Sequence, residues 1–217
     1  DLRSPIFQLN GLLFLIRQAS GTRDESRLQM QAEDLEERIA HLTHTLDNLL
    51  SWSNLQRQNL QPRITAFALQ PVFEHAIGLL KPAAQRKEVR IYTKKLRELE
   101  LVSDHEMVAF IVRNLINNAI KFSTEGGKIE VEAQEAPGAV TFTIADHGVG
   151  IEPHRITTLR EGSHYFTEAG TWGERGTGLG LKLCFEFVDR LEGEIHIESA
   201  KGSGTIVTVR LPQLLRP

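Results

Sequence analysis

The apolar residues in the first part of the chain recur at helical spacing. One helix is predicted by a face that repeats at alternating intervals of four and three residues, made of Leu2, Ile6, Leu9, Leu13 and Ile16. Residues 19–25 are polar and predict a loop. A second, longer helix, ending at about Leu60, is predicted because leucines recur every seven residues, at Leu28, Leu35, Leu42 and Leu49.

These two helices predict an antiparallel hairpin over residues 1–61. Its apolar surface is too wide for two helices to cover, so we expect a second copy of the chain to complete a four-helix bundle, as a homodimer. The alternative is that the hairpin packs against the remainder of its own chain.

Gln61 and Pro62 break the second helix, and beyond them strands and helices are interspersed. Short strands are predicted at residues 63–69, 89–93, 99–103, 128–134, 140–145, 194–199 and 205–211. Helices are predicted at residues 72–87, 104–122, 153–160 and 176–191, and Pro82 is expected to kink or split the first of them. The predicted fold class is therefore α+β: a helical hairpin domain at 1–61, then at 62–217 an α/β sandwich with helices on one face of a mostly antiparallel sheet.

A carboxylate stands at the end of one predicted strand. In the stretch from Thr141 to Ile151, the strand stops at Asp146, and Gly148 and Gly150 follow. An ionised Asp146 could accept a hydrogen bond from an exocyclic amine such as that of adenine, and the glycines would let the backbone approach a flat ligand. The alternative is a strand that leaves through an Asp-x-Gly turn.

The predicted helix at 104–122 has Asp104 as its N-cap and carries Asn114, Asn118 and Lys121 on one face. Asparagine is a weak helix former, so two of them inside a helix need a reason. Amide oxygens suit a Mg²⁺ ion that bridges phosphates, and an ammonium one turn further on can pair with phosphate charge. The alternative is a solvated polar face.

A glycine-rich stretch runs from Gly162 to Gly180, and its last part, Gly176-Thr177-Gly178-Leu179-Gly180-Leu181, opens a predicted helix. Free N–H groups and the positive end of the helix dipole at such an entry favour phosphate. The stretch is neither a P-loop, which needs Gly-Lys-Ser/Thr, nor a dinucleotide fingerprint, which needs another glycine spacing after a strand. A flexible loop before a helix is the alternative.

Composition narrows the function classes. The net charge of −3 and the absence of a basic stripe argue against a nucleic-acid partner. The single cysteine, Cys184, is expected to pack in the core of a protein from a reducing compartment. The strongly apolar run from Leu12 to Ile16 is far too short to cross a bilayer. The chain starts without Met in a helical pattern, so we expect a fragment of a longer protein, with no signal peptide.

In this order, three of these segments resemble the ATP-binding domain of the histidine kinases and their relatives in the GHKL superfamily. N-L-I-N-N-A-I-K-F-S is similar to the N box, D-H-G-V-G-I to the first glycine box and G-T-G-L-G-L to the second. Gly202-Ser203-Gly204-Thr205 is similar to the family's glycine-threonine turn, and the resemblance covers residues 63–211. It implies ATP and Mg²⁺ as cofactors.

The resemblance also assigns roles to residues. It implies that Asn118 ligates Mg²⁺, that Asn114 and Lys121 contact phosphates, and that Asp146 reads adenine. The other residues that it places around the nucleotide are Gly148, Gly150, Ile151, Arg175, Gly176, Thr177, Gly178, Leu179, Gly180 and Thr205.

The first residues of the chain resemble the continuation of the histidine kinase H box. Asp1-Leu2-Arg3-Ser4-Pro5-Ile6 aligns so that the phosphoacceptor His would stand immediately before Asp1, and it is not in this sequence. The resemblance implies that Asp1 orients that His, and that Ser4 falls where the family carries a residue used to dephosphorylate the response regulator. The chain as written is therefore expected to bind ATP but not to phosphorylate itself.

The implied function is the cytoplasmic core of a two-component sensor histidine kinase, with a response-regulator receiver domain as partner and no membrane span in this piece. Two other readings remain open. One is an ATPase of the gyrase or chaperone type, which would need a catalytic base near the asparagine helix. The other is a degenerate, dimeric scaffold that binds ATP without catalysis. The residue encoded before Asp1 discriminates between the kinase and the scaffold.

Overall fold

The computed structural model describes residues 61–94, 96, 99–152, 155–157, 168–174 and 178–213. The chain divides into two units, Asp1–Gln58 and Asn59–Pro217, and all of the described residues belong to the second. The predicted hairpin at residues 1–61, its dimer and the roles of Asp1 and Ser4 fall almost wholly outside the described residues, and they stay predictions.

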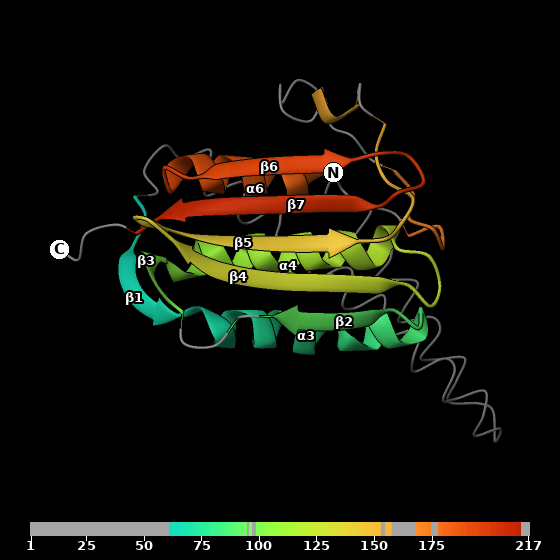
Figure 1. Ribbon diagram of the computed structural model, residues 1–217, viewed down its shortest axis with the longest axis horizontal. Coiled ribbons are helices and arrows are strands. Elements are labelled where there is room, and N and C mark those ends of the chain that lie inside the picture. The colour runs from blue at the N-terminus through green and yellow to red at the C-terminus, as the bar shows by residue number, and fades with distance from the viewer. Residues whose placement is uncertain are drawn as a thin grey trace, which may run out of the picture. The chain divides into compact units, whose positions relative to one another are not determined.

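The second unit is built on a five-stranded sheet with the order β2-β4-β5-β7-β6. Its strands are β2 (Arg90–Lys94), β4 (Lys128–Ala136), β5 (Ala139–Asp146), β6 (Glu194–Ser199) and β7 (Thr205–Pro212). Strand β2 pairs with β4 in parallel, and the other neighbours are antiparallel. Figure 1 shows this sheet face on, with β5 at its centre.

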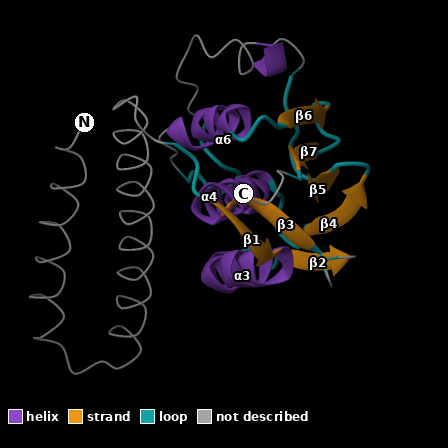
Figure 2. Cartoon of the chain, turned by 90° about the vertical axis from the view of Figure 1, so that its left-hand side faces the viewer, coloured by secondary structure: helices purple, strands orange, loops and turns teal. Residues whose placement is uncertain are grey.

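Three helices cover one face of the sheet: α3 (Leu69–Arg86), α4 (His105–Phe122) and α6 (Leu179–Arg190). Figure 2 shows them together on one side of the strands. Phe73 of α3 joins the helices to the sheet by meeting Phe142 of β5 edge to face at 5.5 Å. Within the helical layer, Phe110 of α4 meets Phe187 of α6 at 4.9 Å. The predicted α/β sandwich is confirmed.

Helix α4 begins where the sequence predicted. The Asp104 side chain accepts a hydrogen bond from the Met107 N–H at 3.0 Å, as an N-cap does. Apolar residues at helical spacing then turn inward, and Val108, Ile111, Leu115 and Ala119 are all at most 3% exposed. The central helix of the layer is thus fixed at its start by a cap and along its length by burial.

Two features differ from the prediction. Strands β1 (Ile64–Ala68) and β3 (Glu100–Asp104) form a separate antiparallel two-stranded sheet, which the strand pattern alone did not specify. Helix α3 is not split at Pro82 but runs on to Arg86. Pro82 and Gly78, whose carbonyl would have received the missing N–H, are both exposed, so water can replace the lost hydrogen bond.

Cys184 of α6 is fully buried, and burial raises the pKa of its thiol, as expected for a core cysteine. Over the described residues, no helix has the length and apolarity that a membrane crossing needs.

Candidate functional site

Several of the predicted site residues that the structure describes lie on α4 or beside its C-terminal end. The last carbonyl groups of a helix have no partner inside it. Here the Val149 N–H donates to the Phe122 oxygen at 3.1 Å and the Thr171 N–H donates to the Lys121 oxygen at 3.1 Å. The Thr171 hydroxyl also donates to the Ser123 oxygen at 2.6 Å. Two segments that are distant in sequence are therefore fastened to the same helix end.

The first segment is the loop after β5, which carries Asp146. This residue is 8% exposed, and its carboxylate accepts the Gly148 N–H at 2.9 Å. Burial raises the pKa of Asp146 and outweighs the backbone N–H groups of Gly148 and Thr205, which lower it. In the part of the chain that the structure describes, Asp146 forms no ion pair. The charge of the carboxylate is thus stabilised less than in water, and a hydrogen-bond donor on a ligand would stabilise it further.

The glycines of this loop make close contacts with the chain itself. A Cβ on Gly148 would collide with the Phe122 carbonyl oxygen, and one on Gly150, where φ is +65°, would collide with the Ala200 carbonyl oxygen. Larger residues would therefore push the loop away from α4 and from the turn before β7. The sequence explained these glycines by a ligand, whereas the structure gives them an additional reason within the fold.

The polar residues of α4 differ in burial. Asn114 is 2% exposed, and its Nδ2 donates to the Phe110 oxygen at 3.0 Å. Asn118 is half-buried one turn further on, and Lys121 is half-buried after it. Burial is the main reason why the pKa of Lys121 is lowered; Glu174 raises that pKa and Lys87 lowers it further. The three residues thus run from the core of the domain to its edge.

The loop of Asp146 is also tied to strands β6 and β7. Thr205 lies opposite Asp146 in the β5–β7 ladder and is 8% exposed. Its hydroxyl lies 3.0 Å from the Ser199 hydroxyl, and Ser199 in turn accepts the Ile151 N–H at 2.8 Å. The structure therefore brings Thr205 and Ile151 together with Asp146.

The glycine-rich helix entry is described from Gly178 onward. Gly178 is the N-cap of α6 with φ of 71°, and Leu179 and Gly180 form the first turn, as predicted. These three residues are half-buried. Arg175, Gly176 and Thr177 lie outside the described residues, and their roles stay predictions.

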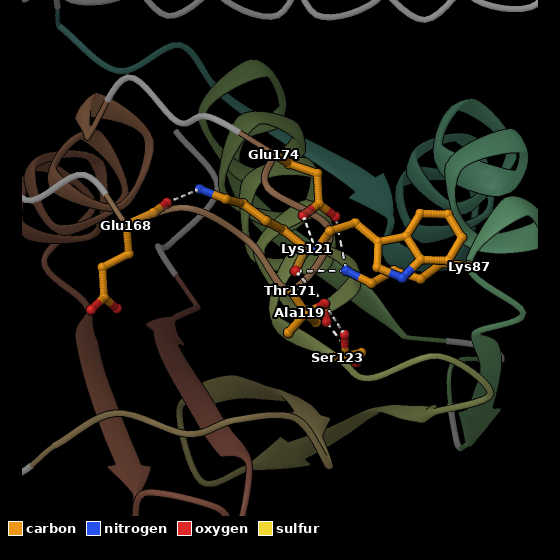
Figure 3. A network of polar contacts seen from close by, with 8 residues as sticks. Lys87, Ala119, Lys121, Ser123, Glu168, Thr171 and Glu174 are labelled. Carbon is orange, nitrogen blue, oxygen red and sulfur yellow. Dashed lines mark hydrogen bonds and ion pairs between the residues drawn. The ribbon is translucent and has the colours of Figure 1, made fainter.

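The second segment fastened to α4 was not predicted. We call residues 168–174 the strap. Its Gly170 N–H donates to the Glu174 oxygen at 2.8 Å, and the carboxylate of Glu174 forms an ion pair of 2.8 Å with Lys87. The Lys87 Nζ also donates to the Lys121 oxygen at 2.7 Å, although Lys87 is only 2% exposed. Figure 3 shows the contacts of Lys87 with Glu174 and with Lys121.

One sequence signal could have pointed to Lys87. It continues the stripe of α3 that contains Phe73, Ala76 and Ala84, all of which are buried. A lysine at the end of an apolar stripe must find a partner or reach solvent. Its partner Glu174 could not be named from the sequence, because it lies 87 residues away.

Residues 103–215 match the protein family described as histidine kinase-, DNA gyrase B-, and HSP90-like ATPase. The histidine protein kinase DivJ of Caulobacter vibrioides is 32% identical over 219 residues, covering 100% of this chain and 36% of DivJ. The chain therefore spans about a third of the length of that curated relative.

Solved structures share the fold. The histidine kinase AdeS of Acinetobacter baumannii superposes with a TM-score of 0.69 at 21% identity, covering 98% of this chain and 96% of that one. The histidine kinase ThkA, solved in complex with the response regulator protein TrrA, superposes with a TM-score of 0.64 at 19% identity, covering 98% of this chain and 58% of that one.

Proposed function

Because the chain belongs to the family of histidine kinase-, DNA gyrase B- and HSP90-like ATPases, we propose that it is the catalytic core of a two-component sensor histidine kinase. It binds Mg·ATP, and the γ-phosphate passes to a histidine and then to an aspartate of a response regulator. The relative DivJ is named a histidine protein kinase, and the solved neighbour ThkA was captured with a response regulator. The supporting observation in this chain is Asp146, a buried carboxylate without an ion pair among the described residues, beside the helix that carries Asn118.

Asp146 supplies the adenine end of this proposed site. Its carboxylate can accept the exocyclic amine, and in a place shielded from water such a hydrogen bond is strong. Because Gly148 and Val149 hold the loop against Phe122, the carboxylate stays at a fixed distance from α4. A nucleotide that bridges the two elements would require such a fixed spacing.

The phosphate end is supplied by α4 and the start of α6. Lys121 brings an ammonium, and the N-terminus of α6, which follows its N-cap Gly178, brings the positive end of a helix dipole. Asn118 is half-buried on α4, and its amide oxygen would be a protein ligand of a Mg²⁺ ion that keeps phosphate oxygens and waters as its other ligands. The described residues contain no group of three or more His, Cys, Asp and Glu suited to a metal, so phosphates and water would complete the coordination. Bound there, Mg²⁺ would offset phosphate charge during transfer.

The predicted hairpin supplies the acceptor side of the proposed reaction. A His before Asp1 would attack the γ-phosphate, with Asp1 holding its far nitrogen in the reactive tautomer. Ser4 would serve the removal of phosphate from the response regulator. In this proposal two hairpins form the homodimer, and the chain acts in the cytoplasm.

The metal role is tested by paired substitutions on one helix. Asn118→Leu removes the amide oxygen at a similar side-chain size and should remove the Mg²⁺ dependence of ATP binding, measured by calorimetry with and without the metal. Asn117→Leu is the matched control, because it makes the same change on another face of α4, and it should leave Mg·ATP affinity within about twofold of wild type. Normal Mg·ATP binding by Asn118→Leu would contradict the assigned ligand.

The kinase role is tested with the protein that includes the residue encoded before Asp1. If that residue is His, incubation with γ-labelled ATP should place a phosphate on the protein that is stable to base and labile to acid. ATP binding without protein-bound label would favour the scaffold, and steady release of free phosphate would favour a gyrase- or chaperone-type ATPase.

A further inference from the structure

Two lysines and one carboxylate meet beside the end of α4. Lys87, which follows α3, is 2% exposed, and its ammonium donates to the Glu174 carboxylate at 2.8 Å and to the Lys121 carbonyl at 2.7 Å. A lysine is almost never buried this far unless it is paired. The ion pair with Glu174 accounts for the burial of Lys87, but it does not say what the pair is for. Neither Lys87 nor Glu174 is among the proposed ATP contacts.

Glu174 also lies beside the side chain of Lys121. The place that a Cβ on Gly170 would occupy is blocked by both the Glu174 Oε2 and the Lys121 Cγ, so the two side chains border the same spot. In Figure 3, Lys87 reaches Glu174 from one side, and Lys121 extends away on the other side to Glu168. The Lys121 Nζ donates to the Glu168 carbonyl oxygen at 2.6 Å. One carboxylate thus lies between two ammonium groups and is bonded to only one of them.

We propose that Lys87 is a positioning residue: its buried ammonium holds the Glu174 carboxylate and so leaves the ammonium of Lys121 to the phosphates of the nucleotide. This inference rests on the proposed function, since it concerns the use of Lys121 in ATP binding. Without Lys87, the Glu174 carboxylate would be an uncompensated anion beside Lys121, and a phosphate would have to compete with it at short range.

The electrostatics agree with this arrangement. Burial raises the pKa of Glu174, but the hydrogen bond from Lys87 and the backbone N–H groups outweigh it, so the pKa lies below the ordinary value. Glu174 therefore stays ionised at neutral pH and is 31% exposed, which leaves it able to pair with a second cation. Glu174 raises the pKa of Lys121, as a nearby anion does, and Lys87 lowers it.

A simpler role for Lys87 would be to anchor the strap. The strap, however, keeps attachments that do not involve Lys87: the Thr171 N–H and hydroxyl bind the Lys121 and Ser123 oxygens, and the Gly170 N–H closes the turn on the Glu174 oxygen. The two roles predict different behaviour when both members of the pair are removed. Anchoring is lost in the double variant, whereas the competition for Lys121 disappears together with the Glu174 charge.

The test is a set of ATP affinities measured on the full chain by calorimetry, for Lys87→Met, Glu174→Gln and the double variant. Lys87→Met should weaken ATP binding by roughly tenfold, since it releases an anion beside the phosphate site. The double variant should return to within about twofold of wild type, because neither a competing carboxylate nor an unpaired buried cation is left. Adenosine, which lacks phosphates, should bind with equal affinity to wild type and to all three variants when its binding is measured by NMR titration.

The control is Lys94→Met, which removes a lysine paired with Glu130 on the exposed edge strand and should leave ATP affinity unchanged. If Lys87→Met lowers stability, Lys87→Gln keeps a donor for the Lys121 oxygen and should show the same loss of ATP affinity. A double variant as weak as Lys87→Met, or an equal loss of adenosine binding, would overturn the proposal. Failure of wild type to bind ATP would instead reject the proposed function.

Discussion

A buried aspartate at the end of a strand lies near each end of α4, Asp104 at the end of β3 and Asp146 at the end of β5, and the surroundings of the two are opposite. At the N-terminal end, Asp104 accepts the Met107 N–H at 3.0 Å and the Arg63 N–H at 2.6 Å, where the helix dipole also favours negative charge. At the C-terminal end, the loop of Asp146 packs against the Phe122 carbonyl, where the dipole disfavours negative charge. The charge of Asp104 is therefore stabilised by the fold itself, whereas the charge of Asp146 would be stabilised further by a hydrogen-bond donor on a ligand.

The largest effect should come from neutralising Asp146. Asp146→Asn keeps an acceptor for the Gly148 N–H, so the fold should be retained, but it presents an amide where the proposed site needs a charged acceptor. ATP affinity should fall about hundredfold or more, because a buried polar mismatch discriminates strongly. Calorimetry measures this loss, and circular dichroism checks the fold. Unchanged ATP affinity would remove the adenine role.

A smaller effect of a different kind should come from Asp104. Asp104→Ala removes the N-cap of α4 and should lower the free energy of unfolding by about 1 kcal/mol, and by more if the Arg63 N–H stays unpaired. Urea denaturation measures this loss. ATP affinity, taken well below the unfolding transition, should stay within about twofold. If Asp104→Ala weakened ATP binding as much as Asp146→Asn, the contrast between the two ends would be wrong.

The smallest effect should be a pH dependence that belongs to Asp146 alone. The folded pKa of Asp146 is raised above its ordinary value of 3.8, so the folded state holds the proton more tightly than the unfolded state. The resulting stabilisation is fully present below the ordinary pKa and is lost as the pH rises through the folded one. Asp146→Asn should therefore gain stability relative to wild type as the pH rises from the ordinary pKa through the folded one. A stability difference that stays constant over this range would contradict the assignment.

The parts of the fold that the sequence predicted are those set by local chemistry. Asp104 caps α4 by bonding to a residue three positions away, and the hairpin of β4 and β5 turns within residues 137–138. Residues close together along the chain were therefore sufficient to predict both features. The pairing of β1 with β3 depends on residues as far apart as Ile64 and Asp104, and two short strands do not specify which partners they choose.

The residues of the candidate site also differ in whether the sequence could predict them. Asp146 and Asn118 could be found because each lies in a recognisable motif at the end of a strand or on a helix face. Lys87 and Glu174 could not be paired, because nothing local in either segment names a partner 87 residues away. Helix α3 was predicted to run past Pro82 with a kink or a split there, and it is not split, since the effect of a proline depends on whether solvent can reach the carbonyl that it leaves without a donor.

Cys184 has a practical consequence for measuring motion in this protein. It is the single cysteine of the sequence, it is fully buried, and burial raises the pKa of its thiol, so it should react slowly with maleimides and spin labels. A cysteine introduced at Trp172, whose side chain is 52% exposed, would then be the main reactive thiol without any change to the native one. A fluorophore placed there would report the response of the strap to added nucleotide against a silent background.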